Sequence, residues 1–165
     1  MACKSLICVL GLVVPLWGQS LQISSLVLSR GRSGSVSVKL VSPPGKAPAA
    51  LQWDLIFPVG QVNIEDSGWS VGGAASAAAK QLTCVRQLRK RPETYAYKCI
   101  LAGGRQTIGN GDVAVVKINI PETAPTGLAV LRLENVLGAS SEATRLDMEP
   151  AQGTITIRAS EPRHK

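Results

Sequence analysis

Two cysteines provide the most reactive side chains of the chain beyond its first twenty residues. Cys84 and Cys99 lie in two runs, QLTCVRQL and TYAYKCIL, that read as the strands of a β-hairpin. A turn centred between Arg91 and Pro92 places the cysteines directly opposite each other, at a distance that a disulfide can bridge. We therefore predict a Cys84–Cys99 disulfide, with two separate buried thiols as the alternative. Two cysteines and one tail histidine fall short of a zinc site.

The ionisable side chains give little support for catalysis. The only histidine, His164, is one residue from the C-terminus, where it cannot be held for acid–base chemistry. The nearest carboxylate pairs are Glu65–Asp66 and Asp147 with Glu149, and the second pair would share one face of a strand, as a glycosidase-like site requires. Surface charge explains both pairs as well. We expect no catalytic residue, no metal and no cofactor, because calcium-loop and nucleotide-binding glycine patterns are missing from the sequence.

Six side chains are candidates for binding rather than for chemistry. Trp69 follows Asp66-Ser67-Gly68 in a loop-like setting and is the best candidate for an exposed ring that stacks on a sugar. Five basic residues near the tip of the cysteine hairpin could bind an acidic partner: Arg86, Arg89, Lys90, Arg91 and Lys98. A solvated loop is the alternative interpretation of this cluster. We expect no nucleic-acid partner, because no stacking aromatic residues are interleaved with the basic ones.

The first twenty residues have the layout of a secretory signal peptide. Lys4 precedes the apolar run SLICVLGLVVPL (5–16), and Gly18 and Ser20 are the small residues of a cleavage site. The apolar run is shorter than the roughly 20 residues that a membrane-spanning helix needs. We therefore predict a signal peptide at 1–20 and an exported protein, secreted or associated with the cell envelope, with no membrane span in the mature chain. An uncleaved N-terminal anchor is the alternative.

Apolar and polar residues alternate with period two through most of the remaining chain. The alternation is clearest at 35–40, 51–57, 114–120, 131–134 and 154–157. Such alternation buries one face of each strand and leaves the other in water. Glycine and proline residues separate the runs, as is typical of a sandwich or barrel. With Leu21–Leu28 and the two strands of the cysteine hairpin, these runs predict an all-β, antiparallel sandwich of eight or nine strands.

One segment, Gly73–Lys80, interrupts the alternation. It is rich in alanine and holds no β-branched residue, so it predicts one short helix between strands. A chain of 165 residues suits a single domain, which we assign to 21–159, followed by a polar tail at 160–165. The formal net charge of +7 favours acidic partners, but it is also a common way to remain soluble.

Three segments, taken in their order, resemble the cohesin-like domain of bacterial exported proteins. They are ALQWDLIFP (50–58), the Gly/Ala-rich stretch 72–80, and GNGDVAVVKINIP (109–121), which leads through APTG (124–127) into LAVLRLENV (128–136) before the chain closes with GTITI (153–157). The resemblance covers about 21–159. It implies a jelly-roll β-sandwich related in shape to a superfamily of carbohydrate-binding modules, and a dockerin as partner. The cysteine hairpin, and the lack of tandem copies or an attached hydrolase in this sequence, depart from the cellulose-degrading members.

These observations predict a non-catalytic, exported binding module that mediates protein–protein interaction with a dockerin-like or other protein partner. The alternative is a carbohydrate-binding module that binds polysaccharide, which predicts an exposed Trp69 beside a second ring. A third possibility, a small surface hydrolase, predicts a cleft with two carboxylates about 5–10 Å apart.

Overall fold

The alternating runs of the sequence form strands. The structure, a computed structural model, describes residues 18–87 and 94–160. The strands of this part are β1 (Ser20–Ile23), β2 (Leu26–Ser29), β3 (Ser33–Val41), β4 (Ala50–Pro58), β5 (Trp69–Val71), β6 (Gln81–Gln87), β7 (Thr94–Ala102), β8 (Gly111–Asn119), β9 (Gly127–Ala139), β10 (Arg145–Asp147) and β11 (Ala151–Arg158). A 3₁₀-helix, η1 (Asp66–Gly68), and an α-helix, α1 (Gly73–Ala77), lie on either side of β5.

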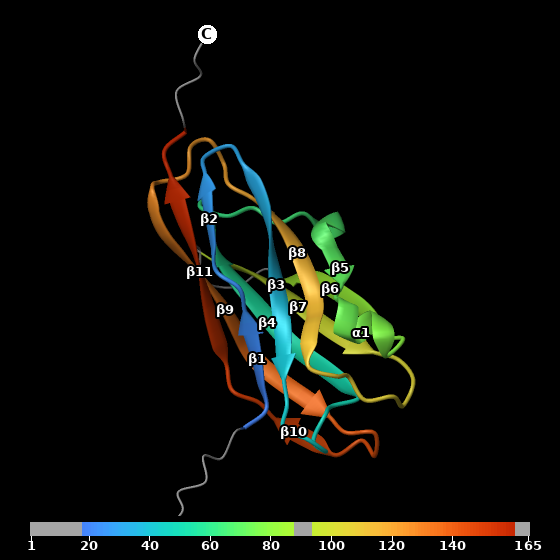
Figure 1. Cartoon of the computed structure of the whole chain (residues 1–165). Helices are drawn as coiled ribbons and strands as arrows, with labels where there is room; N and C mark the ends of the chain where they lie inside the picture. Colours follow the sequence, from blue (N-terminus) through green and yellow to red (C-terminus); the bar gives the residue numbers. More distant parts are fainter. Residues whose placement is uncertain (1–17, 88–93, 161–165) are drawn as a thin grey trace, which may run out of the picture.

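The strands assemble into two sheets that face each other (Figure 1). The smaller sheet has four strands in the order β1-β3-β8-β5. The larger sheet has seven strands, in the order β2-β11-β9-β4-β7-β6 with β10 also paired to β9. Of the strand pairs in the described ranges, only β2 with β11 is parallel. The predicted β-sandwich is confirmed. It has more strands than expected partly because β5 and β10, with three residues each, are too short to show an alternation.

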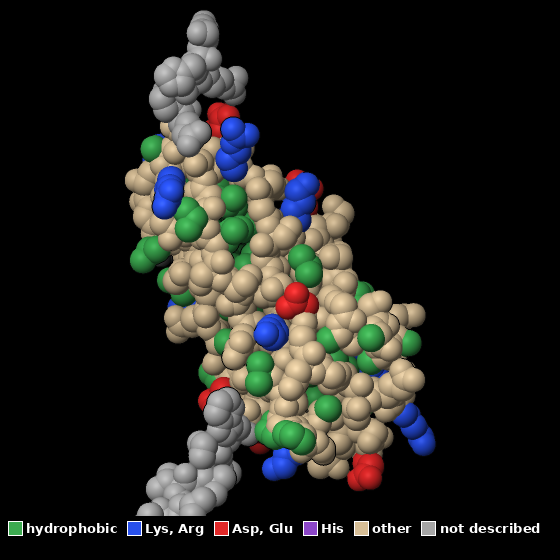
Figure 2. Space-filling view, viewed as in Figure 1, with side chains coloured by type: hydrophobic (Ala, Val, Ile, Leu, Met, Phe, Trp, Pro, Cys, Tyr) green, Lys and Arg blue, Asp and Glu red, His purple; other side chains and the backbone are tan. Residues whose placement is uncertain are grey.

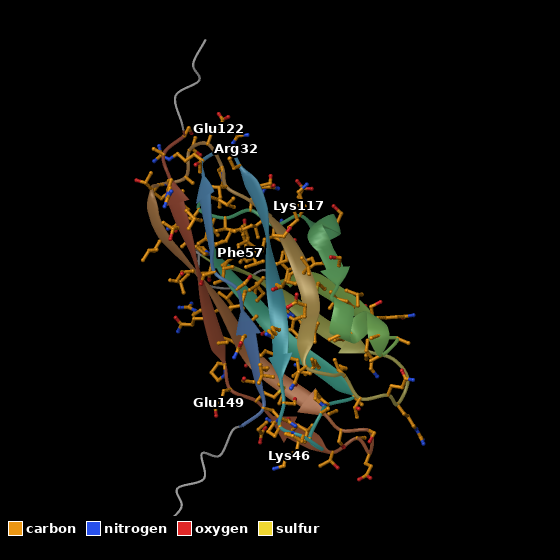
Figure 3. The ribbon with its side chains drawn as sticks, viewed as in Figure 1. Arg32, Lys46, Phe57, Lys117, Glu122 and Glu149 are labelled. Carbon is orange, nitrogen blue, oxygen red and sulfur yellow. A yellow bond between two sulfur atoms is a disulfide. The ribbon has the colours of Figure 1, made fainter. Side chains whose placement is uncertain are left out.

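The inward side chains of the two sheets form one hydrophobic core. Trp53, Leu55 and Phe57 of β4 are fully buried, as their phase in the alternation predicts. Val36 and Val38 of β3 meet them from the other layer in the same buried cluster. Figure 3 shows Phe57 among the side chains that fill the space between the layers. Full burial of each such side chain contributes roughly 1.5–3 kcal/mol, so this core holds the sheets together.

The predicted first strand, Leu21–Leu28, is divided between the two sheets. The chain crosses at Ser24 and Ser25, so that β1 pairs with β3 and β2 pairs with β11. The Ser24 hydroxyl accepts a backbone N–H of β3 (2.9 Å), and the Ser25 hydroxyl accepts one of β11 (3.1 Å). Gly153 of β11 leaves room for the crossing, because a Cβ there would lie 2.9 Å from the Ser24 carbonyl oxygen. Alternation alone could not predict the division, since it does not say which sheet a strand joins.

The alanine-rich segment forms the predicted short helix, α1, which lies against β8. Just after it, the Lys80 ammonium group donates hydrogen bonds to the carbonyls of Gly103 (2.5 Å) and Gly104 (3.3 Å). Burial lowers the pKa of Lys80. These bonds tie the end of the helical segment to the turn after β7. In the described ranges, no helix is long and apolar enough to cross a membrane.

Candidate functional site

The predicted disulfide is present in the described part of the hairpin. β6 and β7 pair with Cys84 directly opposite Cys99, and the two sulfur atoms are bonded. The Cα atoms are 4.1 Å apart, the short spacing of a non-hydrogen-bonded antiparallel pair. Cys99 is buried and Cys84 is half-buried. The bond therefore lies on the inner side of the larger sheet and joins its last two strands.

The basic candidate residues do not all lie on one surface. Arg86 is on the inner side of the hairpin and Lys98 is on its outer side, because they occupy opposite phases of the β6–β7 register. The Arg86 guanidinium lies 5.1 Å from the ring centre of Tyr95 and donates a hydrogen bond to the carbonyl of Ile64 (3.0 Å). The other three basic residues of the predicted tip lie outside the described residues, so their role stays a prediction: Arg89, Lys90 and Arg91.

Trp69 is not the exposed ring that a sugar-binding surface needs. It is half-buried and packs against the core, with its ring centre 5.6 Å from that of Tyr97. Tyr97 is itself fully buried, and its hydroxyl donates a hydrogen bond of 2.5 Å to the Asp66 carboxylate. Burial, with this hydrogen bond, raises the pKa of Tyr97 to about 12. The rings therefore form an internal cluster that holds η1 in place.

The carboxylates considered for catalysis have separate structural contacts. Asp66 accepts the tyrosine hydrogen bond described above, and Asp147 forms an ion pair with Arg145 at 2.7 Å. The shared strand face that a glycosidase-like site would require of Asp147 and Glu149 is not formed, because β10 ends at Asp147 and Glu149 forms a bridge with the start of β1. Across 18–87 and 94–160, no three His, Cys, Asp or Glu side chains gather as metal ligands would.

One outer surface of the sandwich carries most of the exposed apolar side chains, which the sequence pattern did not reveal. Of the seven large hydrophobic residues exposed in the described ranges, five point outward from the larger sheet. We call this surface the apolar face; its five residues are 39–66% exposed and are Val27, Val85, Ile100, Leu128 and Val130.

The outer face of the smaller sheet has a different composition. Its exposed positions on β3 and β8 hold serine and charged residues, among them Ser33, Ser35, Lys39 and Lys117. Figure 2 views the molecule from this side and shows Lys, Arg, Asp and Glu side chains, several of them next to one of opposite charge, among scattered hydrophobic ones. Within the described residues, the only exposed large hydrophobic residue in a strand of this sheet is Val71 of β5.

A hollow of about 310 Å³ opens on the apolar face, at the end of the sandwich where β10 lies in Figure 1. Small side chains on β4 and at the end of β9 leave space between larger neighbours. The lining is mostly apolar and includes Ala50, Gln52, Ile100, Leu137 and Ala139. Arg145, which is paired with Asp147, also borders the hollow.

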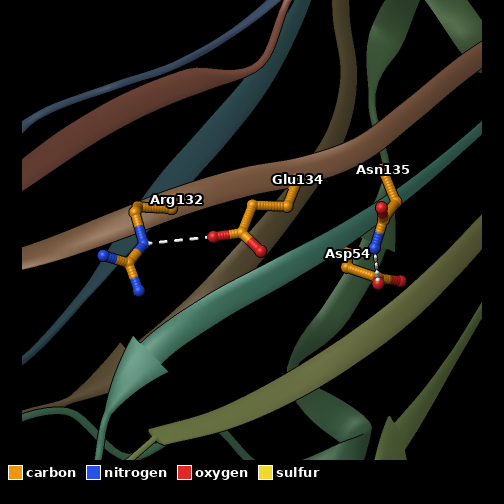
Figure 4. A network of polar contacts seen from close by, with 4 residues as sticks. All are labelled: Asp54, Arg132, Glu134 and Asn135. Carbon is orange, nitrogen blue, oxygen red and sulfur yellow. Dashed lines mark hydrogen bonds and ion pairs between the residues drawn. The ribbon is translucent and has the colours of Figure 1, made fainter.

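A polar group lies at the middle of the apolar face. Asp54 of β4 points outward, yet it is only 4% exposed. Asn135 of β9 donates a hydrogen bond of 2.7 Å to its carboxylate, and Arg132 and Glu134 form an ion pair at 3.3 Å beside it (Figure 4). The centre of this face is thus polar and ordered, with apolar residues on either side.

Asn135 also marks a β-bulge that changes the direction of the following side chains. Between two register pairs with β4, β9 has one residue more than β4, and Asn135 adopts a left-handed conformation with φ 51°. An extra residue reverses the phase of a strand. Leu133 before the bulge is therefore buried in the core, whereas Leu137 after it faces outward and lines the hollow.

No protein-family model matches the sequence, and no curated protein does. The fold is similar to that of solved structures over most of the chain. A non-cellulosomal cohesin from the archaeon Archaeoglobus fulgidus is similar with TM-score 0.64 and 17% identity, over 86% of this chain and 91% of that one. A chain of the Coh-OlpA–Doc918 cohesin–dockerin complex from Clostridium thermocellum is similar with TM-score 0.69 and 12% identity, over 86% and 99%.

A third similar structure is that of the sixth cohesin of Acetivibrio cellulolyticus scaffoldin B in complex with a Cel5 dockerin. Its TM-score is 0.67 at 14% identity, over 86% of this chain and 99% of that one. The structural similarity extends over nearly the full length of each cohesin. Because the sequence identities are low, this similarity establishes the architecture alone. The chain is therefore a cohesin-like β-sandwich.

Proposed function

We propose that this chain is an exported, non-catalytic module that binds a dockerin-like protein domain through the apolar face. Export is supported by the signal-peptide layout of residues 1–20. A non-catalytic role is supported by the position of the only histidine in the tail and by the structural contacts of Asp66 and Asp147.

The difference between the two outer faces carries the proposal. Single exposed apolar residues are normal on any soluble domain, whereas apolar patches mark interaction sites; here the exposed apolar residues form two groups on one sheet, on either side of the polar centre. Here the larger sheet holds five such residues, and the strands of the smaller sheet hold Val71 alone among those described. A partner on the larger sheet would cover Val85 and Ile100 on one side of the polar centre, and Leu128 and Val130 on the other.

The hollow beside Ile100 offers a place for an anchoring side chain of the partner. Binding energy at protein interfaces is concentrated in a few residues that fill well-packed pockets. Ile100 and Leu137 provide apolar walls, and Gln52 adds a hydrogen-bonding group to the lining. The bulge at Asn135 is what places Leu137 there.

Two of the similar structures are, by their descriptions, complexes of a cohesin with a dockerin. This supports a folded protein domain as the partner. Polysaccharide binding receives no such support, because Trp69 is half-buried and its neighbour Tyr97 is fully buried. We therefore propose a protein partner alone.

Two matched substitutions test the proposal. Ile100→Arg puts a charge at the wall of the hollow, and Val71→Arg puts the same charge on the smaller sheet; the two side chains are 45% and 37% exposed. Each protein is immobilised, and the proteins that it retains from the secretions of its source organism are quantified by mass spectrometry. We expect a specific partner to be retained by the wild type and by Val71→Arg, and to be lost at least tenfold with Ile100→Arg. Equal retention by all three proteins contradicts the proposal.

A further inference from the structure

The strands at the edges of the two sheets differ in length. β1 and β5 border the smaller sheet with four and three residues, and β2 borders the larger one with four. β6, at the other edge of the larger sheet, has seven residues. Proteins keep exposed edge strands short, or interrupt them with proline, lysine or a bulge, because unpaired backbone groups bind other strands. β6 has neither proline nor lysine, and its register with β7 is unbroken.

Among the described residues, β5 and η1 pack near β6, but no strand pairs with the edge of β6 that faces away from β7. Each of its seven residues is exposed or half-buried, and among the described strands β7 alone pairs with it. Its one charged residue, Arg86, turns back onto the Tyr95 ring and the Ile64 carbonyl. The disulfide holds Cys84 against β7, which keeps the strand extended. β6 therefore presents a long and stiff edge.

The direction of the free backbone groups follows from the cysteine pair. In a non-hydrogen-bonded antiparallel pair, the N–H and C=O groups of each residue point away from the partner strand. The Cα separation of 4.1 Å puts Cys84 in such a pair, so its N–H and C=O point to the open edge. Because these directions alternate along a strand, Leu82 and Arg86 direct their groups to the same edge.

We propose that β6 pairs antiparallel with β6 of a second copy of this chain, about a two-fold axis at Cys84. A symmetric dimer needs a self-complementary surface. Centred on Cys84, the pairing sets Cys84 against Cys84 of the second copy, and Leu82 against Arg86 of the second copy. Leu82, Cys84 and Arg86, whose backbone groups point to the open edge, then lie opposite one another across the two copies. Each of the three residue pairs exchanges two backbone hydrogen bonds, which gives six in all.

Side chains on the outer side suit the same register. Thr83 lies opposite Val85 of the second copy, and two β-branched residues make a favourable cross-strand pair. The Arg86 side chains of the two copies are separated by four residues along the strand, roughly 13 Å. This exceeds the Debye length of about 8 Å at physiological salt, so their repulsion is screened.

The dimer would place two apolar faces side by side. A two-fold axis between antiparallel edge strands is perpendicular to the sheet, so both outer faces point the same way. One strand pair is smaller than the roughly 1,600 Å² of a standard interface, and the full chain carries a formal net charge of +7, so that two copies repel each other. We therefore expect a weak dimer that strengthens with added salt. The pairing does not depend on the proposed partner and is tested without it.

Sedimentation equilibrium of the purified protein between about 0.01 and 1 mM tests the pairing. The wild type is expected to show a monomer–dimer equilibrium. Thr83→Lys with Val85→Lys puts like charges directly opposite each other across the new strand pair, so this variant is expected to remain monomeric. Thr83→Lys with Val85→Glu puts opposite charges there and is expected to restore the dimer. Both positions are exposed, and far-ultraviolet circular dichroism checks that each variant is folded.

The outcomes distinguish this strand pairing from association through another surface. A wild type that stays monomeric over the whole range overturns it. A dimer that persists in the double-lysine variant, or that is not restored by the lysine–glutamate variant, overturns it as well, because another surface or register would then be responsible. Ile100→Arg, on the neighbouring strand, is expected to leave the dimer unchanged even where it abolishes partner binding.

Discussion

The side-chain amide of Asn135 donates a hydrogen bond of 2.7 Å to the buried carboxylate of Asp54. The bond joins β4 to β9 at the middle of the apolar face, at the residue where the β9 bulge adopts its left-handed conformation. Because the bulge turns Leu137 outward, this pair connects the backbone of the sheet to the shape of the hollow beside Ile100.

Two substitutions at Asn135 should separate the contribution of its hydrogen bond to stability from the contribution of its backbone conformation. Asn135→Gly keeps the left-handed conformation but loses the bond to a charged group, which is expected to lower the free energy of unfolding by about 1.5–3 kcal/mol. Asn135→Ala loses the bond and adds the strain of a Cβ at positive φ, about 1–2 kcal/mol more. Urea denaturation measures both. Equal stability of the two variants would show that the bulge does not need its observed conformation.

The phenol of Tyr97 should make stability depend on alkaline pH. Its pKa rises from the usual 10.0 to about 12 in the folded chain, so folding favours the neutral phenol. This contribution is fully present below pH 10 and is lost as the pH rises from 10 to 12, at roughly 1.4 kcal/mol per unit. Between those pH values the wild type should therefore lose of the order of 2 kcal/mol more than Tyr97→Phe, as measured by urea denaturation.

Tyr95→Phe is the matched control for this measurement. It removes a neighbouring phenol hydroxyl and leaves the Tyr97–Asp66 hydrogen bond in place. Its stability should fall with pH as steeply as that of the wild type. If Tyr97→Phe shows the same slope as Tyr95→Phe, the buried hydrogen bond has no part in the alkaline transition.

The disulfide should stabilise the fold without being needed to form it. Cys84→Ala with Cys99→Ala is expected to lower the free energy of unfolding by about 3 kcal/mol, the value for a loop near 15 residues. The far-ultraviolet spectrum should stay that of a β-protein. In the wild type, Cys84 and Cys99 should react with a thiol reagent only after reduction, which mass spectrometry detects; reaction without reductant would disprove the bond.

The crossing of the first strand between sheets should tolerate no side chain at Gly153. In Gly153→Ala, the new Cβ would lie 2.8 Å from a methyl carbon of Ile23 and 2.9 Å from the Ser24 carbonyl oxygen. Overpacking of this kind is expected to cost about 1–3 kcal/mol. Gly109→Ala is the control, because nothing lies within 4 Å of its Cβ. The melting temperatures of the two variants are compared by thermal unfolding. Equal melting temperatures would argue against a tight crossing at Gly153.

The inward phase of β4 and the disulfide were predictable because they depend on local order alone. Period-two alternation identifies Trp53 and Phe57 as core residues whatever strand lies beside them. The symmetric hairpin likewise sets Cys84 against Cys99. The same register places Arg86 and Lys98 on opposite faces of the hairpin, so local order also argues against a single basic cluster that contains both.

Other features depend on which strands become neighbours. The division of Leu21–Leu28, the phase change in β9 and the hollow all require the sheet order, which no local pattern contains. Two residues carry partial signals of the crossing and of the bulge, which were not used in the predictions from the sequence. Gly153 stands in a strand where a close approach of the backbone needs a glycine, and Asn135 interrupts an apolar strand as a residue that tolerates a left-handed conformation.

Site-specific photo-crosslinking tests the location of the binding surface most directly. A photoreactive amino acid is placed at Gln52, which lines the hollow, or at Ser35, on the outer face of the smaller sheet. The protein is then illuminated with the proteins secreted by its source organism. We predict a covalent adduct with one partner protein from position 52 and none from position 35. An adduct with that partner from position 35 alone would contradict the account.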